Sequence, residues 1–145
     1  MKKRLPDLSL SALLTDLPVA DAIPDIAVRG LVLDARQASA GDVFVALQGH
    51  ERHGLEFADQ ARAGGAVAII HDGMHEDPVD TELPLVACKK LAEALPELAQ
   101  RRWGDPAETL DLVAVTGTNG KTSVAWLLSQ ALGGAMIGTL GIGRP

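Results

Sequence analysis

The chain has 145 residues, a net charge of −6 and an apolar share of 47%, which is enough for a packed core in one or two domains. The acidic balance and an aromatic content of only 3% argue against a nucleic-acid partner, because such proteins carry basic surfaces and rings that stack on bases. The single cysteine, Cys88, rules out an internal disulfide. The longest clean apolar run, residues 66–70, is far shorter than the roughly 20 residues of a membrane span. We therefore expect a cytoplasmic protein with no membrane partner.

The first part of the chain alternates short predicted strands and helices. Apolar residues at helical spacing predict a helix over residues 9–17, with Ser9 or Ser11 as a possible cap. Residues 66–70 lack polar alternation, which is typical of a strand covered on both faces. The other predicted elements are strands over 28–33, 43–47 and 83–87 and a helix over 54–63 that ends at Gly64 and Gly65. This order predicts a small α/β domain over residues 1–88.

The second part predicts a linker helix and the start of another domain. Leucines at helical spacing indicate a helix over 89–103, and Pro96 inside it predicts either a kink or a new start. A strand over 112–115, a helix over 121–132 and a strand over 135–137 then form one βαβ unit. We therefore assign residues 89–145 to a linker helix and the truncated beginning of a P-loop-type domain with a parallel sheet. Since such a sheet needs further strands, we expect the chain to be the N-terminal part of a longer protein.

The segment between the predicted strand at 112–115 and the helix at 121–132 has the composition of a phosphate-binding loop. Gly117 and Gly120 let the backbone turn its N–H groups toward an anion, and Lys121 can reach the β- and γ-phosphates of a nucleotide. The Thr122 hydroxyl can bind Mg²⁺, and the helix dipole favours the same phosphates. The general P-loop pattern has glycine where this chain has Val115, although Gly117 can supply the first turn. A Gly-Lys turn before an ordinary helix is the alternative.

The loop sequence Thr-Gly-Thr-Asn-Gly-Lys-Thr, residues 116–122, resembles the ATP loop of the Mur ligases and of the folylpolyglutamate synthases. Enzymes of this kind phosphorylate a carboxylate with ATP, and an amine then displaces the phosphate to form an amide. The resemblance implies ATP and Mg²⁺ as cofactors, with Lys121 as the catalytic residue and Thr122 as the metal ligand. The implied ATP-binding residues are Gly117, Thr118, Asn119, Gly120, Lys121, Thr122 and Ser123.

A second cluster of polar residues follows the predicted strands at 28–33 and 43–47. The pattern brings Arg36, His50, Arg52 and His53 near each other at two strand ends. Such a cluster suits a diphosphate, because arginine can contact two phosphate oxygens at once. A solvated hairpin rim with ordinary charges explains the same residues equally well.

The stretch from Leu33 to Gly54 is similar to the N-terminal UDP-binding domain of the Mur ligases that add the third residue or the terminal dipeptide. Their pattern is Asp-Ser-Arg, then Gly-Asp-Leu-Phe-Val-Ala, then a loop with glycine. Here Ala35 stands in place of the serine, which removes one hydroxyl contact. The UDP-sugar-binding residues implied by the resemblance are Leu33, Ala35, His50, Glu51 and Arg52.

Residues 136–141 resemble the segment of the Mur ligases that add meso-diaminopimelate or L-lysine to UDP-N-acetylmuramoyl-L-alanyl-D-glutamate. The implied partners are this UDP-linked dipeptide, ATP and a diamino acid, and we expect a monomer. The dipeptide-adding ligase, which residues 57–65 suit equally well, and a non-enzymatic P-loop module stay open as alternatives. The family also uses a carbamylated lysine and a C-terminal domain that this sequence lacks, so we expect the chain alone to bind weakly and turn nothing over.

Overall fold

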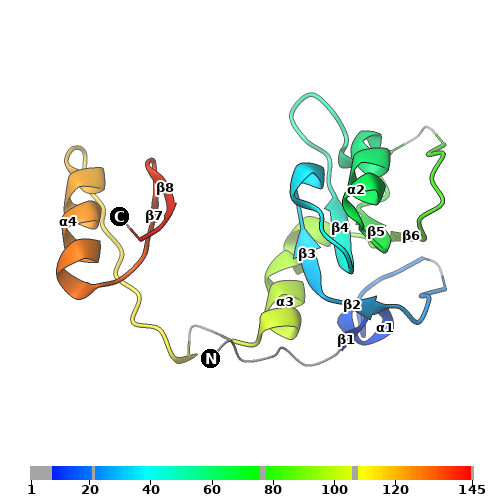
Figure 1. Cartoon of the computed structure of the whole chain (residues 1–145), viewed down its shortest axis with the longest axis horizontal. Coiled ribbons are helices and arrows are strands. Elements are labelled where there is room, and N and C mark those ends of the chain that lie inside the picture. The colour runs from blue at the N-terminus through cyan, green and yellow to red at the C-terminus, as the bar shows by residue number, and fades with distance from the viewer. Residues whose placement is uncertain (1–7, 21, 76–77, 106–107, 145) are drawn as a thin grey trace. The chain divides into compact units, whose positions relative to one another are not determined.

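The computed structural model describes residues 8–20, 22–75, 78–105 and 108–144. The chain forms two compact units, residues 1–106 and 107–145. The first contains a parallel sheet with helices on both faces, and the second contains one helix and a hairpin (Figure 1). The mixed α/β class predicted from the sequence is confirmed.

Four parallel strands form the sheet of the first unit, and their order in space is their order in the chain. Leu31 lies opposite Val43, and Ile69 lies opposite Leu85, so each strand pairs with the strand that follows it in the sequence. The strands are β3 (Gly30–Val32), β4 (Asp42–Ala46), β5 (Ala68–His71) and β6 (Leu85–Ala87). All four overlap the predicted strands, with ends that differ by up to two residues.

Both faces of the sheet are buried. On β4, Val43 and Val45 pack into one apolar cluster, whereas Phe44 and Ala46 pack into another. Neighbouring side chains on a strand point to opposite faces, so this division places one cluster on each side of the sheet. Ile69 and Ile70 of β5 divide in the same way. The prediction of a strand covered on both faces is therefore confirmed for β5.

The first cluster lies under α1 (Leu10–Leu13) and α3 (Leu91–Trp103). Of the two predicted caps of α1, Ser9 is the one observed, because its hydroxyl accepts a hydrogen bond from the Ala12 N–H at 3.2 Å. At the other end of α1, the Arg101 guanidinium donates to the carbonyls of Leu13 at 2.8 Å and Thr15 at 2.5 Å. A two-stranded antiparallel pair, β1 (Leu8–Ser9) with β2 (Ala27–Val28), completes this side.

The second cluster lies under α2 (Ala58–Gly64) and two 3₁₀ turns, η1 (Ala35–Gln37) and η2 (Gly54–Phe57). The helix predicted over 54–63 thus begins with η2 and continues as α2. It ends at Gly65, whose φ of +102° is a left-handed conformation that favours glycine. The predicted stop at this glycine pair is confirmed. Figure 1 shows α2 and α3 on opposite sides of the sheet.

Pro96 lies inside α3 and does not begin a new helix, so the alternative of a fresh start there is wrong. The missing N–H of proline is tolerated because tertiary packing holds the helix: Leu91 and Leu98 are fully buried in the first cluster. The predicted linker helix is thus part of the first compact unit. The predicted boundary between a UDP-sugar-binding domain and the following part, after residue 88, stays a prediction. Cys88 is fully buried, and burial raises the pKa of its thiol, as expected for a packing residue.

Lys90 precedes α3 in a left-handed conformation with φ of +59°. Since a side chain is strained there and glycine is not, Lys90→Gly should raise the free energy of unfolding by about 0.5–1 kcal/mol. Lys89→Gly is the matched control, because Lys89 is also exposed but has no positive φ, and it should lower stability slightly. Urea titration of both variants checks the prediction, which is contradicted if the two changes have the same sign.

The second unit contains α4 (Lys121–Leu132) and an antiparallel hairpin of β7 (Met136–Gly138) and β8 (Gly141–Gly143). The helix has the predicted bounds. The strand predicted over 112–115 is wrong: residues 111–116 are irregular, and Leu112 and Val113 are exposed. A strand needs a neighbour for its backbone hydrogen bonds, and within residues 108–144 β7 pairs with β8. None of the helices in the described ranges is long and apolar enough to cross a membrane.

Candidate functional site

A hollow of about 550 Å³ lies where the chain leaves β3 and β4, at the carboxyl ends of these strands. We call it the strand-end hollow. Ligands of open parallel sheets bind at this edge, because the loops that follow the strands meet there. Its lining residues are Leu33, Asp34, Ala35, Arg36, Phe44, Leu47, Gly49, Arg52, Gly54, Phe57 and Gln60.

Arg36 is oriented at this hollow by Asp34. The Arg36 Nε donates to Asp34 Oδ1 at 2.9 Å, and its Nη2 donates to Oδ2 at 2.7 Å. Asp34 also caps η1 by accepting the Arg36 backbone N–H at 3.0 Å. These bonds, the side-chain ones first, lower the pKa of the Asp34 carboxyl. The Arg36 side chain is 76% exposed, so its outer edge can contact an anion.

Arg52 lines the same hollow from the loop over residues 48–53. Its Nε lies 3.2 Å from Glu56 Oε2, and its guanidinium lies 5.8 Å from the centroid of the Phe57 ring. Two backbone hydrogen bonds close the loop, from Gly49 N–H to the Arg52 carbonyl at 3.0 Å and from Gly54 N–H to the Leu47 carbonyl at 2.9 Å. The structure therefore brings Arg36 and Arg52 to one hollow, as the sequence predicted.

The other two members of the predicted polar cluster lie elsewhere. His53 is 4% exposed and turns into the unit, where its Nε2 lies 2.8 Å from Asp72 Oδ1 and its Nδ1 accepts the Leu55 N–H at 3.0 Å. The prediction that His53 joins the two arginines is thus wrong, because the ring is used inside the fold. His50 and Glu51 are exposed in the loop and are not among the residues that line the hollow. Leu33 and Ala35 do line it, although Ala35 is only 5% exposed.

Asp72 is a residue that the sequence did not single out. Besides His53, its carboxylate accepts the Gln48 N–H at 2.8 Å and the Met74 N–H at 3.1 Å. Burial raises the pKa of Asp72, but the hydrogen bonds from His53 and from the two backbone N–H groups outweigh it and hold the pKa below its ordinary value. The sequence signal that could have identified Asp72 is its position directly after β5, at the same sheet edge as the hollow.

The predicted phosphate loop ends at the first turn of α4. Gly117 and Gly120 have φ of +145° and +76°, conformations that favour glycine, and Lys121 begins the helix. The Lys121 ammonium curls back over the loop and donates to the carbonyls of Gly117 at 2.5 Å and Thr118 at 3.3 Å. Residues 117–121 are exposed. The loop thus places a cation beside backbone turns at a helix N-terminus, where an anion is favoured.

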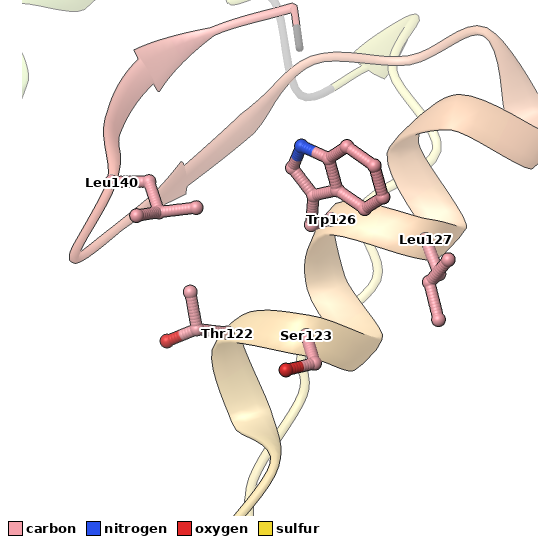
Figure 2. A pocket seen from close by; sticks show the side chains of 5 residues that line it. All are labelled: Thr122, Ser123, Trp126, Leu127 and Leu140. Carbon is pink, nitrogen blue, oxygen red and sulfur yellow. The ribbon is translucent and has the colours of Figure 1, made fainter.

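A second hollow, of about 330 Å³, runs along α4 from the same turn (Figure 2). Thr122 and Ser123 supply hydroxyls at one end, while Trp126 and Leu127 line it from the helix and Leu140 from the hairpin turn. Its lining is mostly apolar, and Leu127 and Leu140 are more than half exposed.

The chain is similar to known ligases over nearly its full length. It is 43% identical over 145 residues to UDP-N-acetylmuramoyl-L-alanyl-D-glutamate–2,6-diaminopimelate ligase of Xanthomonas campestris pv. campestris strain 8004, an alignment that covers 94% of this chain and 28% of that protein. The chain thus spans little more than a quarter of the length of this relative.

Solved structures agree with this likeness. A crystal structure of MurF from Acinetobacter baumannii matches with a TM-score of 0.62 and 29% identity, covering 89% of this chain and 28% of that one. MurF ligase from Thermotoga maritima in complex with ADP matches with a TM-score of 0.52 and 29% identity, covering 72% of this chain and 23% of that one.

The family description "Mur ligase family, catalytic domain" matches residues 27–103, which is more than half of the chain. The matched range includes all four strands of the parallel sheet and the strand-end hollow. The sequence of residues 116–122, the fold and these similarities agree, and the chain belongs to the Mur ligase family.

Proposed function

We propose that the chain supplies the UDP-sugar-binding and ATP-loop parts of a ligase of peptidoglycan precursor synthesis. The ligase joins meso-diaminopimelate, or L-lysine, to UDP-N-acetylmuramoyl-L-alanyl-D-glutamate through an acyl phosphate. The observation that carries the proposal is the 43% identity, over 94% of the chain, to a relative with the diaminopimelate-adding name. The proposal places the enzyme in the cytoplasm.

The strand-end hollow is the proposed UDP-sugar site. Arg36 and Arg52 line it together, and each pairs with one carboxylate, which leaves guanidinium N–H groups for the two phosphates of UDP. Leu33 and Ala35 supply apolar contact. His50 and Glu51, exposed in the adjoining loop, are proposed to meet the sugar.

Gly117–Ser123 is the proposed ATP loop. Its backbone turns and the N-terminus of α4 favour the phosphates, and Lys121 is proposed to stabilise charge on the phosphoryl group that passes to the substrate carboxylate. The Thr122 hydroxyl in the first helical turn fits one ligand position of Mg²⁺, which prefers oxygen and keeps several waters. When bound, Mg²⁺ would neutralise charge on the phosphates.

Lys121→Ala should weaken the affinity of the chain for Mg·ATP by about tenfold, since it removes one charged hydrogen-bond donor from the phosphates. Lys89→Ala, which changes an exposed lysine of the first unit, is the control and should bind like the wild type. Amide chemical shifts of residues 117–123 during an ATP titration measure both affinities. Equal affinities in the wild type and Lys121→Ala would reject the ATP-loop assignment.

A second candidate is the ligase that adds D-alanyl-D-alanine, because a MurF structure matches with a TM-score of 0.62. Titration of the chain with UDP-N-acetylmuramoyl dipeptide and tripeptide separates the two. The leading proposal expects shifts at Leu33, Ala35 and Arg52 with the dipeptide at lower concentration than with the tripeptide. Binding of ATP without either UDP-sugar would instead favour a non-enzymatic nucleotide-binding module.

A further inference from the structure

We propose that Asp72 is a positioning residue for the strand-end hollow and acts on Arg52 through both ends of the loop over residues 48–53. Asp72 itself lines no part of the hollow. The inference rests on the proposed UDP-sugar site, and it names a residue that determines the shape of that site without contacting the ligand.

The Asp72 network consists of Asp72, Gln48 and His53. Gln48 begins the loop, and its N–H donates to Asp72 Oδ2 at 2.8 Å. His53 ends the loop, and its Nε2 lies 2.8 Å from Asp72 Oδ1. One carboxylate therefore holds both ends of a six-residue loop, from a position directly after β5 in the middle of the sheet.

The hydrogen bonds around His53 fix its tautomer. Its Nδ1 accepts the Leu55 N–H at 3.0 Å, so the ring proton lies on Nε2 and is donated to Asp72. The His53 side chain is 3% exposed and the Asp72 side chain 12%. Water therefore competes little for this bond, and a charged acceptor makes it stronger than a neutral one.

Arg52 directly precedes His53 in the loop. A fixed position of His53 therefore also fixes the position of the Arg52 backbone. The Arg52 side chain itself is 63% exposed and held by Glu56 at the surface, a contact that contributes little rigidity. The Gly49–Arg52 backbone bond lies inside the loop and turns with it. Besides the Gly54–Leu47 backbone bond at the base of the loop, the Asp72 network is thus the side-chain contact that fixes the loop carrying the Arg52 guanidinium.

The first test compares Asp72→Asn with Asp59→Asn in the 145-residue chain. Asp59 is the matched control, because its side chain is 81% exposed and its contact with Arg62 is 3.8 Å long. The Gly49 and Gly54 amides report on the loop, since both are hydrogen-bonded across it. We expect them to exchange with solvent about tenfold faster in Asp72→Asn, from one charged hydrogen bond lost, and unchanged in Asp59→Asn. Unchanged exchange in Asp72→Asn would overturn the inference.

The second test uses UDP as the probe and a double-mutant cycle with Arg52→Ala. Asp72→Asn alone should weaken UDP binding by about tenfold. In the Arg52→Ala background the same change should cost less than about twofold, because two residues that act through one contact are not additive. A purely structural role would give the full loss in both backgrounds, and that result would reject the positioning role.

Two variants of His53 keep the inference testable if Asp72→Asn does not fold. His53→Gln retains an amide that can donate to Asp72, whereas His53→Leu does not, so only His53→Leu should speed exchange at Gly49 and weaken UDP binding. Equal behaviour of the two variants would overturn the inference. If the wild-type chain binds no UDP, the proposed UDP site fails, and the exchange rates alone then decide whether the Asp72 network holds the loop.

Discussion

Phe44→Ala should lower the free energy of unfolding of the first unit by about 3–5 kcal/mol, the range for a fully buried phenylalanine. Phe44 is 1% exposed and lies in the middle strand pair of the sheet. Of the other seven buried residues in the second cluster, five are alanines, at positions 35, 46, 58, 61 and 66. Since alanine has no rotamers with which to fill a cavity, the space left by the ring should stay open.

Phe57→Ala is the matched control for this loss. Phe57 is the only other phenylalanine of the sequence, and it packs against the same cluster but is only half-buried. Its loss should be about 1–2 kcal/mol, in proportion to the smaller buried area. Urea unfolding followed at the amide signals of β4 and β5 measures both variants, and a loss in Phe44→Ala no larger than in Phe57→Ala would contradict the prediction.

Asp72→Ala should lower the free energy of unfolding at pH 7 by about 2–3 kcal/mol, because it leaves the buried His53 N–H and the Gln48 N–H without their acceptor. Asp59→Ala, at an exposed position of the same unit, should change it by about 0.5 kcal/mol or less. The same urea titration measures both.

The Asp72 contribution should also depend on pH. The pKa of the folded-state carboxyl lies below the ordinary value of 3.8, so the unfolded chain takes up the proton first as the pH falls. The stabilisation is therefore fully present above pH 3.8 and disappears as the pH falls through the folded-state pKa. The difference in stability between wild type and Asp72→Ala should shrink in that range, and a difference that grows on acidification would refute the assignment.

The first unit could be predicted closely because its signals are local. Val43–Leu47 and residues 66–70 are apolar runs between turn residues, and Ser9 and Gly65 have the chemistry of helix ends. The prediction of a strand over residues 112–115 was wrong for a different reason. An apolar run shows the tendency to pair, but pairing needs a second strand, and in residues 108–144 the strands β7 and β8 pair with each other.

The site was predictable where it depends on the order of the strands. Arg36 and Arg52 follow two neighbouring strands, and this order alone placed them at one hollow. The direction of His53 was not predictable, because it depends on Asp72, which is 19 residues away in sequence and reaches it only through the pairing of β4 with β5. Polar pairs of this kind form between residues on different strand ends, so they leave no periodic pattern in the sequence.

The link from Arg101 to the carbonyls of Leu13 and Thr15 joins segments 86 to 88 residues apart. The sheet, by contrast, pairs each strand with its predecessor, so it can assemble as the chain leaves the ribosome. The four-residue α1 is too short to persist alone. The segment that forms α1 is therefore fixed late, after the α3 segment with Arg101 has emerged. Until then, the apolar face of α1 lacks part of the cluster that buries it in the folded unit.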